Sequence, residues 1–597
     1  MGSIQIPEAE HEAVIVPSIP ATPAVALVPD TPAGTLCDGQ DTAMGKDSSI
    51  DHHAAEKTTT AAAAAEDDAE YPRGVRFILI MLVVAFDVFL VALDQTIVST
   101  AVPQVTNEFN SFSDVGWYGS AYLLTSTAFQ PLFGRLYASF GVKWIYLLAF
   151  CIFELGSLLC AVATSSPMFI VARAIAGLGM AGGYSGCLII INLVAPLHVR
   201  PLLTSLVGVI YGIGGTIGPI IGGALTSEAT WRWCFYLNLF CIPVVVPVIV
   251  FFLKVKHRPQ TTSLTARLLA IDWLGTALIL CSLICILLVF QWGGIKYAWS
   301  DSRIIGLIVG FFAIAVAFAV DQWYMVDRAT TPFRIFKQRT ILGGSIVNFM
   351  VGATYFAELY FLPIYFQSIK GDSAIRSGVA TLSFIISVIF SVSMTGGLVN
   401  KFGHYIPFLF IGTALMTIGA GTLYTLQPDT GLSQWVGLQF LAGFGPGMTF
   451  MLPFIASTAV LAPADIELGS AVVIFWQTCG GAIAVSLAQS IFQNKFSLYL
   501  SGIPGIDPAA ILSKGVSAFR ETTPPEFLPA VVAAANQALG KVWLAIVVLG
   551  GVSFFSVFLM ELDRKIDVEA SKQGEVDKKA NRSAPGEGDV ERASTEP

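Results

Sequence analysis

Five ionisable side chains stand inside long runs of apolar residues: Asp87, Asp94, Glu154, Arg173 and Glu358. In a lipid bilayer an unpaired charge costs at least ~2.5–3.5 kcal/mol, so such residues are expected to be paired or functional. Asp87 and Asp94 are seven residues apart and therefore lie on nearly the same face of a helix. Because no Lys or His stands deep in these runs, Arg173 is the expected partner of the carboxylates.

Asp94, Arg173, Asp87 and Glu154 together have the chemistry of a proton carrier. Burial favours the protonated carboxyl group and a nearby Arg favours the ionised one, so the two effects together allow a proton to bind and leave near physiological pH. The alternative for Asp94 and Asp87 is an ion pair that only fixes helix packing. Glu154 has the alternative of simply facing neighbouring helices.

The second half of the chain offers aromatic and amide groups suited to a lipophilic ligand, since apolar cavities with few polar anchors bind such molecules. Glu358 precedes YFLPIYFQ (360–367) and is expected to line the cavity and attract cationic substrates. The predicted cavity residues are Glu358, Tyr355, Gln439, Trp476 and Gln477. Many of the aromatic and amide side chains have the alternative of facing lipid or another helix. Further candidates are Tyr360, Tyr365, Gln367, Phe475 and Gln489.

The composition of the chain requires a membrane. Of 597 residues, 54% are hydrophobic and 12% are charged, whereas a soluble domain carries about 25% charged residues. Many charges lie in the tails 1–70 and 561–597, which are too polar to bury a core and are predicted to be disordered. The net charge of −8 belongs to tails and loops and gives no reason to expect a nucleic-acid partner.

Other motifs exclude other kinds of chemistry. Residues 39–46 resemble a phosphate loop, but the spacing is one residue too long and Asp47 replaces the required Ser or Thr. An ATP-driven pump is therefore not expected. The nine cysteines form no CxxC or Cys/His cluster, so we predict no metal site, no disulfide framework and no cofactor.

Apolar runs of about 20 residues, long enough to cross a hydrocarbon core of ~30 Å, recur from residue 77 onward. They predict an all-α polytopic membrane protein with fourteen transmembrane helices, of which the second is the least hydrophobic. The predicted spans are 77–99, 117–137, 144–163, 168–191, 203–226, 234–254, 273–292, 304–323, 342–366, 378–399, 406–426, 435–458, 469–492 and 542–560.

Basic residues predict the orientation of these spans, because Lys and Arg gather in cytoplasmic loops. With the N-terminus inside, the cytoplasmic segments hold sixteen Lys and Arg residues and the short external loops hold five. Both termini are therefore predicted to be cytoplasmic, and the long segment 493–541 to be external. The five external residues are Arg232, Lys296, Arg303, Lys370 and Arg376.

An internal repeat divides the spans. GRLYASFG (134–141) matches GGLVNKFG (396–403) at an offset of 396 − 134 = 262, and RAIAGLG (173–179) matches QFLAGFG (439–445) at an offset of 439 − 173 = 266. Parallel six-helix halves that enclose a site at the middle of the membrane are typical of the major facilitator plan. The predicted parts are a first half at 77–254, two inserted helices at 273–323 and a second half at 342–560.

The motifs resemble those of the fourteen-span drug:proton antiporters of the major facilitator superfamily, in particular fungal exporters of toxins and secondary metabolites. The resemblance covers about residues 75–565, and its strength lies in the order of the whole series. The motifs are LDQTIVSTAVP (93–103), the loop from Gly134 to Lys143, RAIAGLGMAGG (173–183), GVIYGIGGTIGPIIGG (208–223), WRWCFYLN (231–238) and YFLPIYFQ (360–367).

One position departs from the family. The family commonly has an acidic and a basic residue where this chain has Ala138 and Ser139. The acidic group usually helps to latch the cytoplasmic side shut, so the resemblance implies that the latch here is weaker or built from other groups.

Glycines at four-residue spacing mark the fifth span. Each series lies along one helix face and permits close helix approach, while the proline permits a bend. The resemblance implies a tight pivot that is closed to protons, and plain helix packing is the alternative. The conformational motif comprises Gly208, Gly212, Gly214, Gly218, Pro219 and Gly222, with Gly134 and Gly141 in the preceding loop motif.

These features together predict a secondary active transporter that exports small lipophilic compounds in exchange for protons by alternating access. It is expected to be a monomer in the plasma membrane, with a vacuolar membrane as the alternative, and not an enzyme. Its expected partners are the bilayer, a small lipophilic substrate and protons. The other functions considered are an importer or vacuolar carrier of amino acids or metal chelates, and a membrane sensor that has lost transport.

Overall fold

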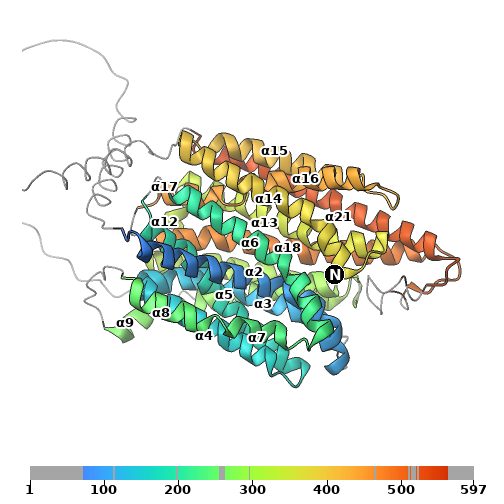
Figure 1. The fold of residues 1–597 in the computed structure, drawn as a ribbon, viewed down its shortest axis with the longest axis horizontal. Coiled ribbons are helices and arrows are strands. Elements are labelled where there is room, and N and C mark those ends of the chain that lie inside the picture. Colours follow the sequence, from blue (N-terminus) through green and yellow to red (C-terminus); the bar gives the residue numbers. More distant parts are fainter. Residues whose placement is uncertain are drawn as a thin grey trace, which may run out of the picture. The chain divides into compact units, whose positions relative to one another are not determined.

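The computed structural model describes residues 71–562, apart from 110, 112–113, 197–198, 255–262, 270, 295, 463–464, 509–510, 512–519 and 521–522. Both predicted disordered tails, except for residues 561 and 562, and the stretch that resembles a phosphate loop lie outside these residues. Within the described ranges the chain is almost wholly helical and forms no β-strand, which confirms the predicted all-α class (Figure 1).

The first half is built from seven helical segments. Several of them begin with a proline in the first turn, where the missing N–H has no helical partner to lose. Pro243 has this place in α8, directly after the helix breaks at Phe240 and Cys241. The segments are α2 (Val75–Phe109), α3 (Val115–Phe140), α4 (Val142–Ala161), α5 (Ser166–Val194), α6 (Arg200–Glu228), α7 (Trp233–Leu239) and α8 (Ile242–Phe252).

Two long helices, α10 (Trp273–Trp292) and α11 (Ser302–Met325), are inserted between the halves and pack against each other. Asp272 caps α10 by accepting a hydrogen bond from the Gly275 N–H (2.6 Å). The same carboxylate accepts bonds from Gln322 Nε2 (2.6 Å) and from the Thr330 N–H (3.1 Å), so it ties α10 to α11 and to the connector that follows. The short segments around this pair are α9 (Leu264–Leu269), η2 (Val326–Arg328) and α12 (Phe333–Phe336).

The second half repeats the helical pattern of the first. Its first helix ends in a π-helical turn, and Gly371 follows this turn with a φ of +77°, a conformation that glycine adopts without strain. The segments are α13 (Arg339–Ile364), η3 (Tyr365–Lys370), α14 (Ala374–Phe402), α15 (Ile406–Leu423), α16 (Leu432–Thr449), α17 (Leu452–Val460), α18 (Ile466–Leu500), α21 (Leu528–Ser556) and η4 (Val557–Leu559).

Thirteen helical segments among the described residues are long and apolar enough to cross a membrane, and they coincide with every predicted span except the second. The second span, 117–137, lies within the 26-residue helix α3. Ser126, Thr127 and Gln130 on α3 are buried in the protein, so this helix turns polar groups inward and is less apolar than its neighbours. Helices α18 and α21 extend into the predicted external segment 493–541 and leave 501–527 between them.

Helix packing follows the sequence repeat. In the first half α2 packs against α6, and α5 packs against α3 and α4; in the second half α13 packs against α18, and α16 packs against α14 and α15. The neighbouring pair α15 and α16 is visible in Figure 1. The halves meet through two matched contacts, α3 with α18 and α6 with α14. Such paired interfaces are where two halves can rock against each other.

Candidate functional site

The centre of the first half holds a buried ion pair between α2 and α5. Arg173 Nη1 lies 2.6 Å from Asp94 Oδ2, and both side chains are at most 1% exposed. The second carboxylate oxygen, Asp94 Oδ1, accepts a hydrogen bond of 3.1 Å from Asn238 Nδ2. Every oxygen of this carboxylate is therefore engaged, which is the condition under which a charge is tolerated in the membrane interior.

Arg173 is held in place by backbone and aromatic groups. Its Nε donates to the Tyr118 carbonyl (3.1 Å), and its guanidinium lies 4.3 Å from the centre of the Tyr122 ring and 5.9 Å from that of Phe235. Cation–π contacts of this kind stabilise a desolvated guanidinium. Helices α2, α3, α5 and α7 thus converge on one charged pair.

The motif WRWCFYLN explains how α7 reaches the ion pair. At its start, Trp231 Nε1 (2.6 Å) and Arg232 Nη2 (2.8 Å) bind the Glu108 carboxylate at the end of α2. At its end, Asn238 contacts Asp94 and also donates to Ser157 Oγ on α4 (3.0 Å). Sequence reasoning did not single out Asn238, although a lone amide in the apolar run 234–254 was an available signal.

Asp87 has surroundings of its own, two turns along α2. Its Oδ2 accepts hydrogen bonds from Tyr146 Oη (2.8 Å) and from Cys187 Sγ (3.3 Å). These donors are uncharged, so the prediction that Arg173 serves the carboxylates in common holds for Asp94 and not for Asp87. Tyr146 and Cys187 come from α4 and α5, and nothing in the one-dimensional pattern pairs them with Asp87.

The ion pair adjoins an aromatic cluster that bridges the halves. Gln95, next to Asp94 on α2, accepts a hydrogen bond from Tyr211 Oη on α6. The Tyr211 ring in turn contacts Phe356 on α13 and Phe450 after α16, each at 6.4 Å between ring centres. We name this group the central aromatic cluster; it consists of Tyr184, Tyr211, Tyr355, Phe356, Phe384 and Phe450.

Gln439 takes the place of Arg173 in the second half, and Glu358 lies on α13, the helix that corresponds to α2. The offset from Arg173 to Gln439 is 439 − 173 = 266, one of the two offsets of the repeat, whereas the offset from Asp94 to Glu358 is 358 − 94 = 264 and equals neither of them. The Glu358 and Gln439 side chains are fully buried, and their polar side-chain atoms have no hydrogen-bond partner within the described part of the chain. The second half has glutamine where the first half has arginine, so a carboxyl group and an amide lie in an apolar interior. Buried polar groups of this kind normally form a hydrogen bond, here with a ligand or with water.

The other predicted cavity residues have mixed surroundings. Tyr355 belongs to the central aromatic cluster, and its ring centre lies 4.8 Å from that of Phe450. Gln477 is used for packing, because its Nε2 donates to the Phe450 carbonyl (2.9 Å). Trp476 packs on Phe475 and Phe349, in an apolar group that includes residues of α3 and α10. Its indole nitrogen has no partner among the described residues.

The glycines of α6 form two faces, as their spacing predicted. A Cβ atom on Gly214 would lie 2.6 Å from the Phe89 carbonyl oxygen of α2, and one on Gly222 would lie 2.8 Å from that of Ile97. Gly208 and Gly212 instead face α14 and the α16–α17 junction of the other half. Gly218 also contacts α2, and Pro219 lies within the helix.

The two glycines of the loop motif have different roles. Gly134 packs against Ala471 of α18, so it lies at the contact between the halves. Gly141 joins α3 to α4 at a φ of +85°, a conformation in which a side chain would be strained. Ala138, which replaces the family's acidic residue, is exposed.

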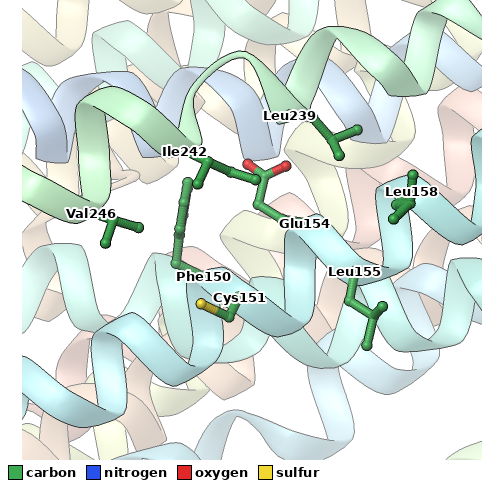
Figure 2. Close-up of a pocket in the computed structure, with 8 residues that line it drawn as sticks. All are labelled: Phe150, Cys151, Glu154, Leu155, Leu158, Leu239, Ile242 and Val246. Atoms are coloured by element: carbon green, nitrogen blue, oxygen red, sulfur yellow. The ribbon is translucent and has the colours of Figure 1, made fainter.

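Glu154 lies apart from the ion pair. It lines a groove between α4 and the α7–α8 break, and neither of its carboxyl oxygens has a hydrogen-bond partner in the part of the chain described (Figure 2). The structure therefore gives Glu154 no direct bond to Asp94, Arg173 or Asp87.

Paired helical halves around a buried charge define a class of protein, the secondary membrane transporters. The sequence profile described as Major Facilitator Superfamily matches residues 84–487. The chain belongs to the Major Facilitator Superfamily. It is thus an integral, multi-pass membrane transporter.

Curated relatives match most of the chain. It is 43% identical over 470 residues to the efflux pump aflT of Aspergillus parasiticus, which covers 78% of this chain and 91% of that protein. It is 42% identical over 494 residues to the MFS-type efflux pump MFS1 of Trichophyton rubrum, with coverages of 82% and 92%.

Solved structures share the fold at low sequence identity. The proton:xylose symporter XylE matches with a TM-score of 0.51 at 17% identity, over 83% of this chain and 98% of that one. A bacterial homologue of the human lysosomal transporter Spinster matches with a TM-score of 0.52 at 15% identity, over 82% and 97% of the chains.

Proposed function

We propose that this transporter is an antiporter that exports a small lipophilic compound, a toxin or secondary metabolite, in exchange for protons. The names of the relatives support the direction and the substrate class: two are efflux pumps, and a third, from Neocamarosporium betae, is an aspyridones efflux protein with 40% identity over 476 residues. No covalent chemistry is needed for this activity.

The buried Asp94–Arg173 pair is the observation that carries the proton coupling. Protonation of Asp94 removes the negative charge that balances Arg173, so the pair is stable in only one of the two protonation states. Gln95 is the next residue on α2 and binds Tyr211 of the central aromatic cluster. A change at Asp94 is thereby transmitted over one residue to the contact between the halves.

The substrate is proposed to bind beside that cluster, with Glu358 and Gln439 as its polar anchors. Both side chains are buried without partners among the described residues, and Tyr355 lies one helical turn from Glu358 on α13. Aromatic walls with few polar groups bind lipophilic molecules, and a carboxyl group adds a preference for donors or cations.

The test of this function is Asp94→Asn, which fixes the side chain in a form that cannot release a proton. The purified full-length protein is reconstituted into lipid vesicles in the inside-out orientation. In these vesicles a proton gradient should drive accumulation of a fluorescent lipophilic dye by the wild type. The variant should bind the dye with unchanged affinity but accumulate no more than empty vesicles do.

The matched control is Asp372→Asn, which removes a half-buried carboxylate from its ion pair with the exposed Arg376 (3.1 Å). Exposed pairs contribute about 0–1 kcal/mol, so this variant should accumulate dye like the wild type. Gradient-driven accumulation by Asp94→Asn at normal protein levels would overturn the assignment of the proton site.

We also propose that both termini face the cytoplasm of a plasma-membrane transporter, which the excess of basic residues in the predicted cytoplasmic loops supports. Ser501 follows α18 and is exposed. In intact cells that produce a cysteine-free variant, Ser501→Cys should react with an impermeant maleimide, whereas tags at either end should bind antibody only after permeabilisation. Labelling of a terminal tag in intact cells would reverse the orientation.

A further inference from the structure

A groove of about 170 Å³ lies on the outer side of the first half, between α4 and the α7–α8 break. Figure 2 shows the Glu154 carboxyl group pointing from α4 toward Leu239 and Ile242 at this break. Seven of the eight lining residues are apolar or carry a thiol, and Glu154 is the eighth. The groove is thus an apolar surface with a single strongly polar group.

The groove opens toward the membrane. Its lining residues Cys151, Leu155, Leu158 and Ile242 are exposed at the surface of the protein. Glu154 itself is only 3% exposed, and both carboxyl oxygens lack partners within the described residues. A polar group buried without a partner costs free energy, and hydrocarbon supplies no water to relieve that cost.

The depth of Glu154 restricts what can satisfy it. On the 20-residue helix α4 it is the thirteenth residue, which places it about 18 Å from one end and about 10 Å from the other at 1.5 Å per residue. The headgroup of a phospholipid stays at the interface, about 15 Å from the middle of the bilayer. The partner must therefore be a molecule that dissolves in the hydrocarbon core.

We propose that this groove binds a small, membrane-dissolved aromatic alcohol, with the ring against the apolar lining and the hydroxyl group on Glu154. An apolar cavity of about 150 Å³ holds one benzene ring, so the groove of about 170 Å³ has room for one ring. A hydroxyl group both donates and accepts, so it can form hydrogen bonds with a carboxyl group in either protonation state. This site is separate from the proposed transport pathway and does not rest on the export activity.

Photolabelling of the full-length protein in lipid vesicles tests this site directly. The two probes are a phenyl trifluoromethyl-diazirine that carries a hydroxymethyl group and the same diazirine with a methyl group in its place. Mass spectrometry compares labelling of the groove peptides, 150–158 and 239–246, with that of α11, whose surface is largely exposed and reports general exposure to dissolved probe.

The alcohol should label the groove peptides about three- to tenfold more than the methyl probe, as one buried hydrogen bond predicts, with no preference at α11. Glu154→Leu should abolish the preference while keeping the apolar lining, and Glu154→Gln should retain part of it. Leu148→Ala, at an exposed position of α4 outside the groove, is the matched control and should keep it in full.

Equal labelling by the two probes in the wild type, or an unchanged preference in Glu154→Leu, would overturn the proposal. Because α11 is measured in the same sample, poor incorporation of a variant lowers labelling everywhere and leaves the ratio interpretable. Dye export is not measured in this experiment. The proposal for the groove can therefore be tested independently of the proposed antiport.

Discussion

Among the intramembrane charges, hydrogen-bond partners separate three situations. Asp94 has an arginine and an amide, Asp87 has a hydroxyl and a thiol, and Glu154 and Glu358 have no partner in the described structure. A carboxylate bound by a cation favours ionisation, and one without donors does not. The residues that sequence reasoning grouped as one proton-binding set therefore differ in chemistry, and Asp94 is the one coupled to a cation.

Asp272 shows the same principle at the membrane surface, where a pH effect is measurable. Burial raises the pKa of Asp272, but hydrogen bonds from Gln322, Gly275 and Thr330 outweigh burial and hold the pKa below its usual 3.8. A carboxyl group with a lowered pKa in the folded state stabilises the fold above its ordinary pKa, and this contribution is lost as the pH falls.

Asp272→Asn should therefore destabilise the protein by about 1–3 kcal/mol near neutral pH, because one of the oxygens that its donors face becomes an NH2 group. The difference in melting temperature from the wild type should shrink as the pH is lowered through 4 toward 3. Asp301→Asn, at the cap of α11, is the control and should change little, since Asn caps helices as well as Asp does. A difference that is constant with pH would contradict the assignment.

At the scale of elements, the packing of α6 against its neighbours depends on its glycines. Its α2-facing glycines bring the two backbones into contact within one half. A Cβ atom on Gly212 would instead lie at ordinary contact distances from α14, 3.8 Å from Ile385 Cγ2 and 3.6 Å from Ile389 Cγ1. The first face packs within one half, and the second packs at the contact between the halves. In alternating access we expect only the second contact to change.

Gly214→Ala should destabilise the protein by about 1–3 kcal/mol. The added methyl group would lie 2.6 Å from the Phe89 carbonyl oxygen, and a backbone atom cannot move aside without shifting the helix. Gly223→Ala on the same helix should be neutral, since its Cβ atom would meet no atom within 4 Å. Thermal unfolding of both purified variants in the same detergent gives the comparison. Equal melting temperatures would show that α2 and α6 are not in close contact.

The inserted helices supply a contact where the family's acidic latch residue is missing. Arg135 at the end of α3 donates through Nε to the Ala329 carbonyl (2.9 Å), in the connector after α11. The neighbouring residues Thr330 and Thr331 are held by Asp272 and Gln322. The expectation that other groups replace the latch stays a prediction, and this hydrogen bond ties the first half to the insert next to the contact of Gly134 with α18.

For the whole molecule, alternating access requires the α6–α14 contact to separate. A Cβ atom on Gly208 would lie 3.3 Å from Val392 Cγ1, so cysteines at these positions are within reach of a disulfide. Oxidation of Gly208→Cys/Val392→Cys should abolish dye accumulation in vesicles, and reduction should restore it. Full transport by the oxidised protein would mean that this contact does not open.

The control for this experiment is a link within the insert. A Cβ atom on Gly310 of α11 would lie 3.8 Å from Cys285 Sγ of α10, so Gly310→Cys alone creates a second bridgeable pair. Because α10 and α11 pack on each other and belong to neither half, this link should leave transport unchanged. The contrast between the two links separates movement of the halves from a general effect of oxidation.

The amino-acid sequence by itself determined the class of protein, since runs of apolar residues separated by charged loops have no stable place outside a membrane. It also determined the repeat, the two glycine faces of α6 and the partner of Asp94, because helix periodicity and the scarcity of basic residues leave few choices. These features depend on spacing along one chain. Periodicity alone is enough to read them.

Only the tertiary structure decided which side chains meet across helices. Asn238 on Asp94, Tyr146 and Cys187 on Asp87, and Tyr211 beside Gln95 join residues separated by 59 to 144 positions. It also separated Glu154, in a groove between α4 and the α7–α8 break, from Glu358, buried in the second half. A sequence pattern gives each helix a polar face, but the rotation and depth at which helices pack decide whether that face meets a cation, an aromatic ring or lipid.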